Sequence, residues 1–315
     1  KGSDPFGALR CFAVMATILI TGGSGLIGSA LTKRLLLEGH TVRWLSRSAG
    51  MHGTVQAYAW DLDASSMDAH AIAGVDHIIH LAGAGIAEVR WSEARTRVLI
   101  ESRTRGPELL HRTCERAGHW PKTFISAAGT GYYGAVTGDH TFTEEDGPGT
   151  DTIARISVAW ELSVDQWQAR SRVVKLRTPM VLARDAGALK PLARLARFGL
   201  ASAVGNGKQI MPWVHLNDLV SAYVKAMNDP HIMGAYNIVA AHQPDNRTFM
   251  RTLASTLHRP FILPAAPATV LRWVVGDVAD ILLHGSAVSN AKATTAGFEF
   301  GTSHLNDALK DLYPD

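Results

Sequence analysis

A glycine-rich segment near the N-terminal end constrains the fold of this chain more than any other feature. The segment TGGSGLIG, residues 21–28, follows the apolar run TILI and opens a stretch of helical periodicity. Gly22, Gly25 and Gly28 stand three residues apart, which is the spacing of a dinucleotide-binding turn between a strand and a helix. The alternative is a glycine-rich turn that binds no ligand. The strand before the turn and the helix after it favour dinucleotide binding over that alternative. The residues expected to contact the dinucleotide are Gly22, Gly25, Leu26, Ile27 and Gly28.

The three glycines have separate physical roles in such a turn. The first permits a tight bend, the second lets the backbone approach a pyrophosphate, and the third lets the helix pack close to the strand. The helix N-terminus then offers free N–H groups to the phosphates. A second match, GTGYYG at residues 129–134, is followed by a polar segment rather than a helical pattern, so we do not expect it to bind phosphate.

Short apolar runs alternate with helical patterns along the first half of the chain, with short connections between them. This order is typical of an α/β fold in which helices cover both faces of a parallel sheet. The expected strands are residues 17–20, 41–45, 55–60, 76–81, 123–126 and 172–176. The expected helices are residues 26–38, 93–114 and 153–169.

The pattern changes after Thr178, which indicates a second, smaller unit. The expected elements there are a basic amphipathic helix at 187–198, a glycine-containing loop at 201–209, a strand at 211–215, a helix at 216–227, a last sheet strand at 236–239 and helices from 247 onward. We therefore predict a doubly wound parallel sheet of the Rossmann type with a mostly helical C-terminal lobe. The dinucleotide-binding domain is expected at 15–180, with 211–240 returning to the sheet, and the lobe at 181–315.

The end of the second strand indicates which dinucleotide is bound. NAD sites place an Asp or Glu about 20 residues past the glycines, where it accepts from the ribose 2′-hydroxyl. Here that position reads Leu45-Ser46-Arg47, without an acid. Arg47 can pair with a 2′-phosphate and Ser46 can donate from its hydroxyl. We therefore expect NADP, the alternative being that Arg47 is a solvated charge.

Taken together, these motifs resemble the extended short-chain dehydrogenase/reductase family of the sugar-nucleotide epimerase/dehydratase type. The segments that carry the resemblance are TGGSGLIG, WDLD at 60–63, HLAGAGI at 80–86, ISAAGTGYYG at 125–134, KLRTPMVL at 175–182 and PWVHLNDL at 212–219. One branch, labelled "epimerase family protein", is similar through its R-W, W-E and G-F-x-F motifs. These stand here at Arg90-Trp91, Trp160-Glu161 and residues 297–300.

The resemblance implies further cofactor contacts. Leu81 and Ala82 end the fourth strand beside the cofactor path, and Arg103 takes the place of an Asn found in related enzymes. Arg103 would add positive charge near the cofactor, unless it is a helix-surface arginine. Glu161 is expected either to contact the cofactor or to lie on a solvated helix face. Asp61 would accept from the adenine amino group or, alternatively, cap its own loop.

The usual catalytic pair of this superfamily is absent. Its Tyr-x-x-x-Lys motif occurs nowhere in the chain, and aligning Trp160 with the lysine puts Ile156 in the place of the tyrosine. The candidate substitutes lie after the fifth strand, where reactive groups gather at the edge of a parallel sheet. The candidate catalytic residues are Tyr133, Tyr132 and Thr130, with charge supplied by Arg103, Lys175, Arg177 or His215. The alternative is that Tyr133 packs under the loop and His215 caps a strand end.

Composition excludes several other classes of function. The 31 basic and 28 acidic residues are interspersed, so no nucleic-acid partner is expected. Two cysteines, Cys11 and Cys114, and the absence of H-E-x-x-H argue against a disulfide framework or a metal site. Two cysteines without a paired motif indicate a reducing, cytoplasmic setting. No apolar run reaches the roughly 18 residues of a spanning helix, so we expect no membrane partner. Residues 1–6 are expected to lie outside the fold, and Met15 is the expected native start.

Two functions follow from the sequence. The first is an NADP-dependent oxidoreductase or epimerase acting on a small-molecule substrate. The second is a non-catalytic, nucleotide-bound regulator or scaffold, a class to which the cell-division-inhibitor label of some relatives corresponds. The complete glycine turn is consistent with both functions, and the missing Tyr-x-x-x-Lys pair favours the second.

Overall fold

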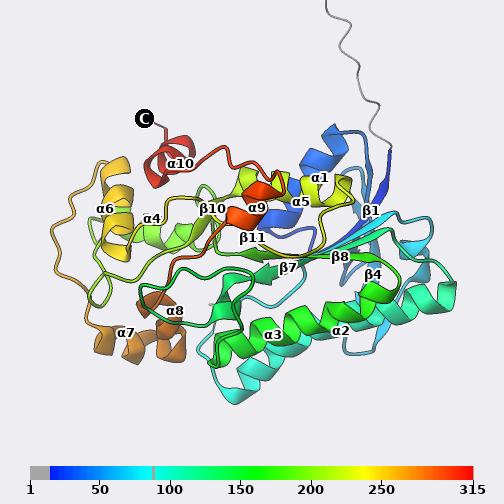
Figure 1. Ribbon diagram of the computed structural model, residues 1–315, viewed down its shortest axis with the longest axis horizontal. Coiled ribbons are helices and arrows are strands. Elements are labelled where there is room, and N and C mark those ends of the chain that lie inside the picture. The colour runs from blue at the N-terminus through cyan, green and yellow to red at the C-terminus, as the bar shows by residue number, and fades with distance from the viewer. Residues whose placement is uncertain (1–14, 87–88, 315) are drawn as a thin grey trace, which may run out of the picture.

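A mostly parallel sheet runs through one half of the molecule, and a smaller lobe lies beside it (Figure 1). The computed structural model describes residues 15–86 and 89–314, so residues 1–6 and Cys11 lie outside the described residues. The parallel strands are β1 (Thr17–Thr21), β2 (Thr41–Ser46), β4 (Val55–Asp61), β6 (His77–His80), β7 (Thr123–Gly129), β8 (Arg172–Thr178) and β11 (Gly234–Asn237). Two short strands, β3 (Gly50–His52) and β5 (Ser66–Met67), pair antiparallel with β4.

The strand order confirms the predicted doubly wound fold. The order across the sheet is β11-β8-β7-β6-β1-β2-β4-β3, so the chain leaves β1 toward β2 and later returns to its other side at β6. In open α/β sheets, the carboxyl ends of two such strands form the crevice in which ligands bind. The predicted glycine turn follows β1 and therefore lies at this crevice.

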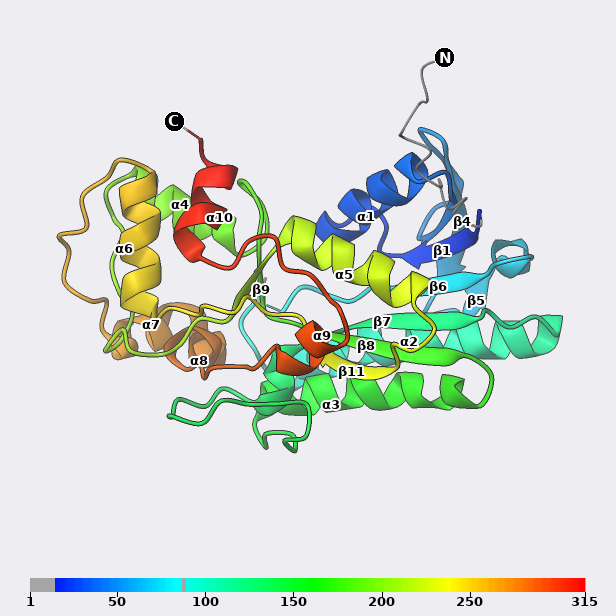
Figure 2. The same cartoon turned by 45° about the horizontal axis from the view of Figure 1, so that its top comes forward.

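Helices cover both faces of the sheet (Figure 2). On one face lie α1 (Leu26–Leu37) and α5 (Leu216–Asn228), and on the other α2 (Glu93–Ala117) and α3 (Thr152–Asp165). Because side chains alternate along a strand, Ile18 and Ile20 pack toward α1 and α5, whereas Leu19 between them packs toward α2. Both faces are thus buried, as a parallel sheet requires.

The C-terminal lobe has its own core. Buried Leu189, Phe249 and Leu309 join α4 (Leu189–Arg197), α6 (Asn246–Thr256) and α10 (Leu305–Leu312). The lobe also contains a two-stranded sheet of β9 (Met180–Leu182) and β10 (Trp213–His215), together with α7 (Ala268–Val275) and α8 (Ala279–Leu283). Short 3₁₀ helices are η1 (Ala69–Ile72), η2 (Thr130–Tyr133), η3 (Gln166–Ala169) and η4 (Gly276–Val278).

Two segments differ from the predicted domain division. Of residues 211–240, β11 joins the central sheet beside β8, but β10 pairs with β9 in the separate small sheet. After α8 the chain returns to the sheet domain, where α9 (Ala291–Thr295) and buried Phe298 pack, the latter 5.2 Å from the ring of Tyr236. Both pairings join residues far apart in sequence, so local periodicity carries no signal for them. No helix in the described part of the chain is both long and apolar enough to cross a membrane.

Candidate cofactor and active site

The backbone of the glycine turn shows why glycine is needed at its first and last positions. Gly22 has φ +72°, and a Cβ there would lie 3.0 Å from the backbone nitrogen of Ala82. A Cβ on Gly28 would lie 2.3 Å from the carbonyl oxygen of Gly22, so α1 could not pack this close with any other residue. Gly25 precedes α1 with φ −74°, and a Cβ there would meet only Gly22 at 3.3 Å. The outer side of Gly25 is therefore open to a ligand.

A hydroxyl joins the carboxyl ends of β1 and β6 at the crevice. Thr21 Oγ1 accepts from the backbone N–H groups of Leu81 (3.2 Å) and Ala82 (3.1 Å) and lies 2.8 Å from Nδ1 of His80. Burial lowers the pKa of His80 to about 3, so its ring is neutral at physiological pH. The predicted contacts Leu81 and Ala82 are thus held rigidly beside the glycine turn.

An indole that the sequence analysis did not single out also borders this turn. A Cβ on Gly23 would lie 2.4 Å from Nε1 of Trp44, and the Trp44 N–H donates to Thr32 on α1 at 3.0 Å. Trp44 stands in β2, two residues before the predicted contact Ser46 and three before Arg47. A glycine in the turn opposite a tryptophan in the neighbouring strand is the signal that could have revealed this contact.

The residues predicted to recognise the 2′-phosphate lie at the end of β2. Arg47 is exposed, and none of the carboxylates in the described residues pairs with it. The Ser46 hydroxyl donates to the carbonyl of Ser48 and accepts from its N–H at 3.2 Å. The described structure therefore leaves the Arg47 guanidinium available to a phosphate.

Asp61 follows the loop-capping alternative. Its Oδ1 accepts from the backbone N–H groups of Asp63 at 2.8 Å and Ala64 at 2.9 Å. The carboxylate thus stabilises the turn after β4. Its contact with an adenine amino group stays a prediction.

Arg103 is not the helix-surface residue of the alternative interpretation, because only 5% of it is exposed. Its guanidinium donates to the carbonyls of Leu99 (3.0 Å) and Ala84 (2.9 Å) and lies 4.9 Å from the ring of Trp160. Burial, together with the charge of Arg95, lowers the pKa of Arg103 to about 10. Among the residues that the structure describes, no carboxylate neutralises Arg103. A buried positive charge therefore stands beside the loop after β6, where it favours an anion.

Glu161 does not lie on a solvated helix face, whereas its contact with a cofactor stays a prediction. It is 6% exposed, and both its oxygens accept from Arg177, at 2.7 Å from Nε and 3.0 Å from Nη2. Although burial lowers the pKa of Arg177, the Glu161 carboxylate raises it above its ordinary value. The two side chains form a bidentate ion pair between α3 and β8.

Tyr133 is held in the same network. Its hydroxyl accepts from Arg177 at 2.9 Å and donates to Oδ1 of Asn237 in β11 at 2.8 Å. Burial raises the pKa of Tyr133 above its ordinary value, despite the opposing effect of the guanidinium. The packing alternative therefore describes this side chain: it joins η2, β8 and β11.

The other two predicted catalytic hydroxyls lie in the same 3₁₀ helix but are half-buried. The Arg177 guanidinium stands 3.6 Å from the centre of the Tyr132 ring. Within residues 15–86 and 89–314, the Tyr132 hydroxyl has no hydrogen-bond partner, and none is found for the Thr130 hydroxyl either. Tyr132 is thus the tyrosine of this segment whose hydroxyl remains available.

Lys175 and His215 are committed elsewhere. The Lys175 ammonium lies 2.6 Å from Asp165 and 4.0 Å from Glu161, both on α3. His215 caps α5 by accepting from the N–H of Asn217 at 3.3 Å, and its Nε2 lies 3.3 Å from Asp311. It therefore caps a helix rather than a strand end. No group of His, Cys, Asp and Glu in the described residues has the arrangement of a metal site.

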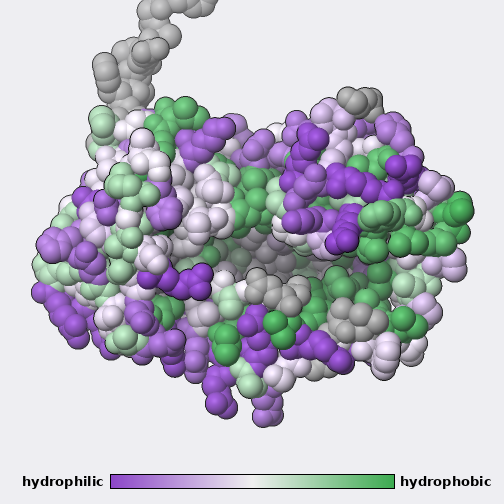
Figure 3. All heavy atoms as spheres, turned by 180° about the vertical axis from the view of Figure 1, so that it is seen from behind, coloured by the Kyte–Doolittle hydropathy of each residue, from purple (hydrophilic) through white to green (hydrophobic). Residues whose placement is uncertain are grey.

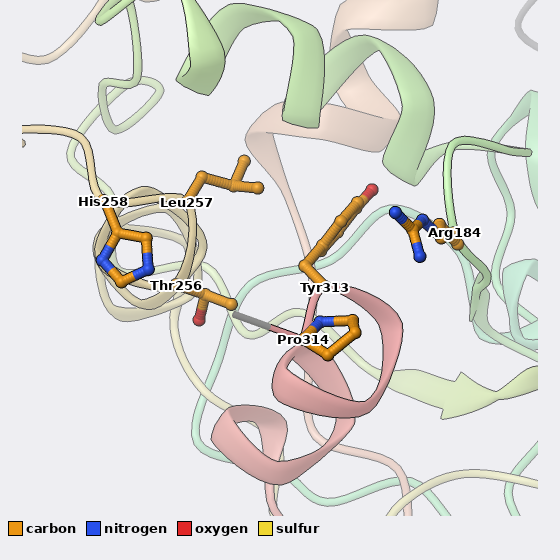
Figure 4. Close-up of a pocket in the computed structure, with 6 residues that line it drawn as sticks. All are labelled: Arg184, Thr256, Leu257, His258, Tyr313 and Pro314. Atoms are coloured by element: carbon orange, nitrogen blue, oxygen red, sulfur yellow. The ribbon is translucent and has the colours of Figure 1, made fainter.

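The surface is hollowed between the sheet domain and the lobe, as the rear view shows (Figure 3). A separate pocket of about 520 Å³ lies within the lobe, between the loop after β9 and the ends of α6 and α10 (Figure 4). None of the predicted site residues lines it. Its lining residues are Arg184, Thr256, Leu257, His258, Tyr313 and Pro314.

Comparisons with known proteins agree with this architecture. Residues 18–239 match the NAD dependent epimerase/dehydratase family, and residues 266–312 match a domain of unknown function, DUF1731. An epimerase family protein of Mycobacterium bovis is 34% identical over 296 residues, 93% of this chain and 96% of that protein. Mouse epimerase family protein SDR39U1 is 32% identical, covering 94% and 99% of the two chains. The crystal structure of human SDR39U1 with NADPH superposes with a TM-score of 0.85 at 29% identity, covering 95% of this chain and 99% of that one.

Proposed function

Because this chain belongs to the NAD-dependent epimerase/dehydratase family, we propose that it binds NADP(H) across the switch point of its sheet. We propose further that it is an NADP-dependent oxidoreductase or epimerase acting on a small-molecule substrate. The observation that carries the cofactor assignment is the glycine turn, which is open to a ligand at Gly25. The end of β2 beside it has no Asp or Glu and presents an exposed Arg47. The human relative with NADPH supports the same choice.

The cofactor's negative charge meets favourable groups at both ends of the crevice. Arg47 and Ser46 would hold the 2′-phosphate through charge-assisted hydrogen bonds. Free N–H groups at the start of α1, including those of Leu26 and Ile27, would receive the pyrophosphate. Arg103 would raise the local positive potential from below the loop after β6, with its side chain fixed by backbone carbonyls.

The chemistry that a bound nicotinamide supplies is hydride transfer. This chain must provide the accompanying proton at a substrate oxygen, and we assign that task to Tyr132. Its hydroxyl is available, and the Arg177 guanidinium lies 3.6 Å from the centre of its ring. Thr130 offers a second hydroxyl in the same helical turn. Tyr133, which the sequence ranked first, would instead position Arg177.

One observation favours the non-catalytic alternative. Ile156 and Trp160, which take the places of the superfamily's tyrosine and lysine, are both buried, at 1% and 9% exposure. A nucleotide-bound regulator needs only the cofactor crevice and would tolerate this loss. The two functions are separated by turnover: an oxidoreductase consumes NADPH and an epimerase converts its substrate without net change in the cofactor, whereas a regulator binds NADPH and converts no substrate.

The test has two stages. First, NADPH retained on purification and its affinity are measured, which checks the cofactor site alone. Next, NADPH consumption and the conversion of substrate to product are followed with a panel of carbonyl compounds and sugar nucleotides, for the parent protein, Tyr132→Phe and Tyr133→Phe. We expect Tyr132→Phe to lower kcat by about a hundredfold or more at unchanged NADPH affinity. Full activity of this variant would contradict the assignment of Tyr132, and NADPH binding without any turnover would favour the regulator.

A further inference from the structure

The guanidinium of Arg103 is a buried cation that the described part of the chain does not neutralise with a carboxylate. Two of its nitrogens donate to the carbonyls of Leu99 and Ala84, but its Nε is buried without a hydrogen-bond partner among the described residues. Burying a charge in this way opposes folding unless an opposite charge compensates it. An anionic ligand beside Arg103 would supply that compensation.

The contacts of Arg103 place its charge beside the glycine turn. A Cβ on Gly83 would lie 3.3 Å from Cζ of Arg103, and the Ala84 carbonyl accepts from the guanidinium at 2.9 Å. On the other side, a Cβ on Gly22 would lie 3.0 Å from the backbone nitrogen of Ala82. The path from the glycine turn to the guanidinium therefore runs through residues 82–84, at the carboxyl end of β6.

An indole holds this guanidinium from the side of α3. Cζ of Arg103 lies 4.9 Å from the centre of the Trp160 ring, and Trp160 is 9% exposed. A cation over an aromatic ring is attracted to it, and the attraction is stronger where water is excluded. Trp160 is also the residue that aligns with the lysine of the Tyr-x-x-x-Lys motif. The place of that lysine is thus taken by a ring that carries a guanidinium.

Four basic groups were candidates to replace the charge of the missing lysine, and the structure separates Arg103 from the other three. Lys175 and Arg177 each pair with a carboxylate of α3, and His215 lies 3.3 Å from a carboxylate of α10. Among the four, Arg103 alone has no carboxylate partner within the described residues. Its positive charge is therefore the one that remains for a ligand.

We propose that Arg103 and Trp160 together replace the lysine that this chain lacks. Arg103 supplies a buried positive charge that attracts the anionic cofactor, and Trp160 is a positioning residue that holds this charge beside the loop after β6. The inference rests on the proposed function, because the anion that it requires is NADP(H). A buried charge is screened little by salt, so this attraction should persist at ionic strengths that weaken an exposed contact such as Arg47.

The first experiment measures NADPH affinity by fluorescence titration, and the unfolding midpoint, for Arg103→Met. Methionine keeps an unbranched side chain without the charge, so affinity should fall about tenfold, with the same ratio at about 0.1 M and about 0.5 M salt. The unfolding midpoint should stay or rise, because a buried charge without a counter-ion is removed. The matched control, Arg112→Met, removes an exposed charge from the same helix and should change neither quantity.

Two variants of Trp160 test whether the two residues act as one unit. Trp160→Leu should weaken NADPH binding about threefold in the parent protein but not in the Arg103→Met background, because both changes act through the same charge. The double variant Arg103→Met/Trp160→Lys returns a lysine to the place it has in the family. Its affinity should return to within about threefold of the parent, which a purely structural role of Arg103 would not produce.

The outcomes distinguish this inference from the proposed function. A parent protein that binds no NADPH contradicts the proposed function itself, and the inference with it. If the parent binds NADPH and Arg103→Met binds it equally well, the inference alone is wrong. It is also wrong if affinity and unfolding midpoint fall together in Arg103→Met, because Arg103 then supports the loop. If the double variant does not fold, the two backgrounds of Trp160→Leu decide: equal weakening in both shows that the residues act separately and contradicts the inference.

Discussion

The turn between β1 and α1 and the helix η2 after β7 lie at the same edge of one sheet, but their polar groups are arranged in opposite ways. At the turn, Gly25 leaves space on its outer side and Arg103 carries a buried charge that no described carboxylate neutralises. At η2, Tyr133, Arg177 and Glu161 already satisfy one another. The first region thus has the features of an open ligand site, and the second those of an internal support.

The difference shows that a chain can keep the phosphate-binding turn of its family while it lacks the Tyr-x-x-x-Lys pair. A phosphate turn works through backbone geometry, so it persists wherever the glycines persist. A proton-transfer pair works through two side chains, and here buried Ile156 and Trp160 stand in their places. The predictions below test whether the two regions are as independent as this comparison requires.

The largest effect is expected from Glu161→Gln. It leaves the Arg177 guanidinium buried without its counter-charge, and losing one partner of a buried ion pair costs about 3–5 kcal/mol. Denaturant unfolding measures this loss. The matched control is Glu101→Gln, whose partner Arg105 lies 3.0 Å away in an exposed pair, and it should cost less than about 1 kcal/mol. Equal losses in the two variants would show that the Glu161 pair is not a support.

The complementary change at the turn is Gly25→Val. Its side chain would enter the space that the pyrophosphate requires, so NADPH affinity should fall about a hundredfold or more while the unfolding midpoint stays near that of the parent. Fluorescence titration and thermal unfolding measure the two quantities. Gly138→Val, at a loop position with nothing within 4 Å of the added Cβ, serves as the control. A folded Gly25→Val protein with normal affinity would remove the turn from the cofactor site.

A smaller effect concerns acid. Burial holds the pKa of His80 at about 3 in the folded protein against an ordinary 6.5, so below pH 6.5 the unfolded chain binds a proton that the folded protein does not. His80 alone should therefore lower the free energy of unfolding by about 1.4 kcal/mol for each pH unit below 6.5, down to its folded value, and His77, whose pKa burial lowers to about 4, adds a further loss. Unfolding curves across this range check it. His80→Gln should reduce the slope by one proton, and a slope that His80→Gln does not alter contradicts this origin.

The sequence predicted the parts of the molecule that local patterns encode. The glycine spacing located the turn between β1 and α1, and the apolar runs located the parallel strands with errors of a few residues at their ends. Arg103 was singled out by its place in the family pattern, and its contact with the cofactor stays a prediction. Its burial depends on the carbonyl of Ala84, 19 residues earlier in the chain, and no periodicity reports such a contact.

The parts that sequence analysis missed depend on pairings between distant elements. Glu161 and Arg177 meet because α3 packs across β8, and the available signal was Arg177 among the three basic residues of the otherwise apolar strand RVVKLRT. Trp44 in β2 packs against Gly23 of the glycine turn. Neither the glycine motif nor the Ser46-Arg47 pattern includes this tryptophan. The pairing of β10 with β9 was also missed. The two strands lie about 30 residues apart in the chain, and each is only three residues long.

The central claim is that the crevice at β1 and β6 binds NADP(H) and recognises its 2′-phosphate through Arg47. The direct measurement is a parallel fluorescence titration of the parent protein and Arg47→Ala with NADPH and NADH. We expect the parent to bind NADPH about ten- to a hundredfold more tightly than NADH, and Arg47→Ala to lose most of this preference by weakening NADPH alone. Equal affinities of the parent for the two cofactors, or an unchanged preference in Arg47→Ala, would contradict the account.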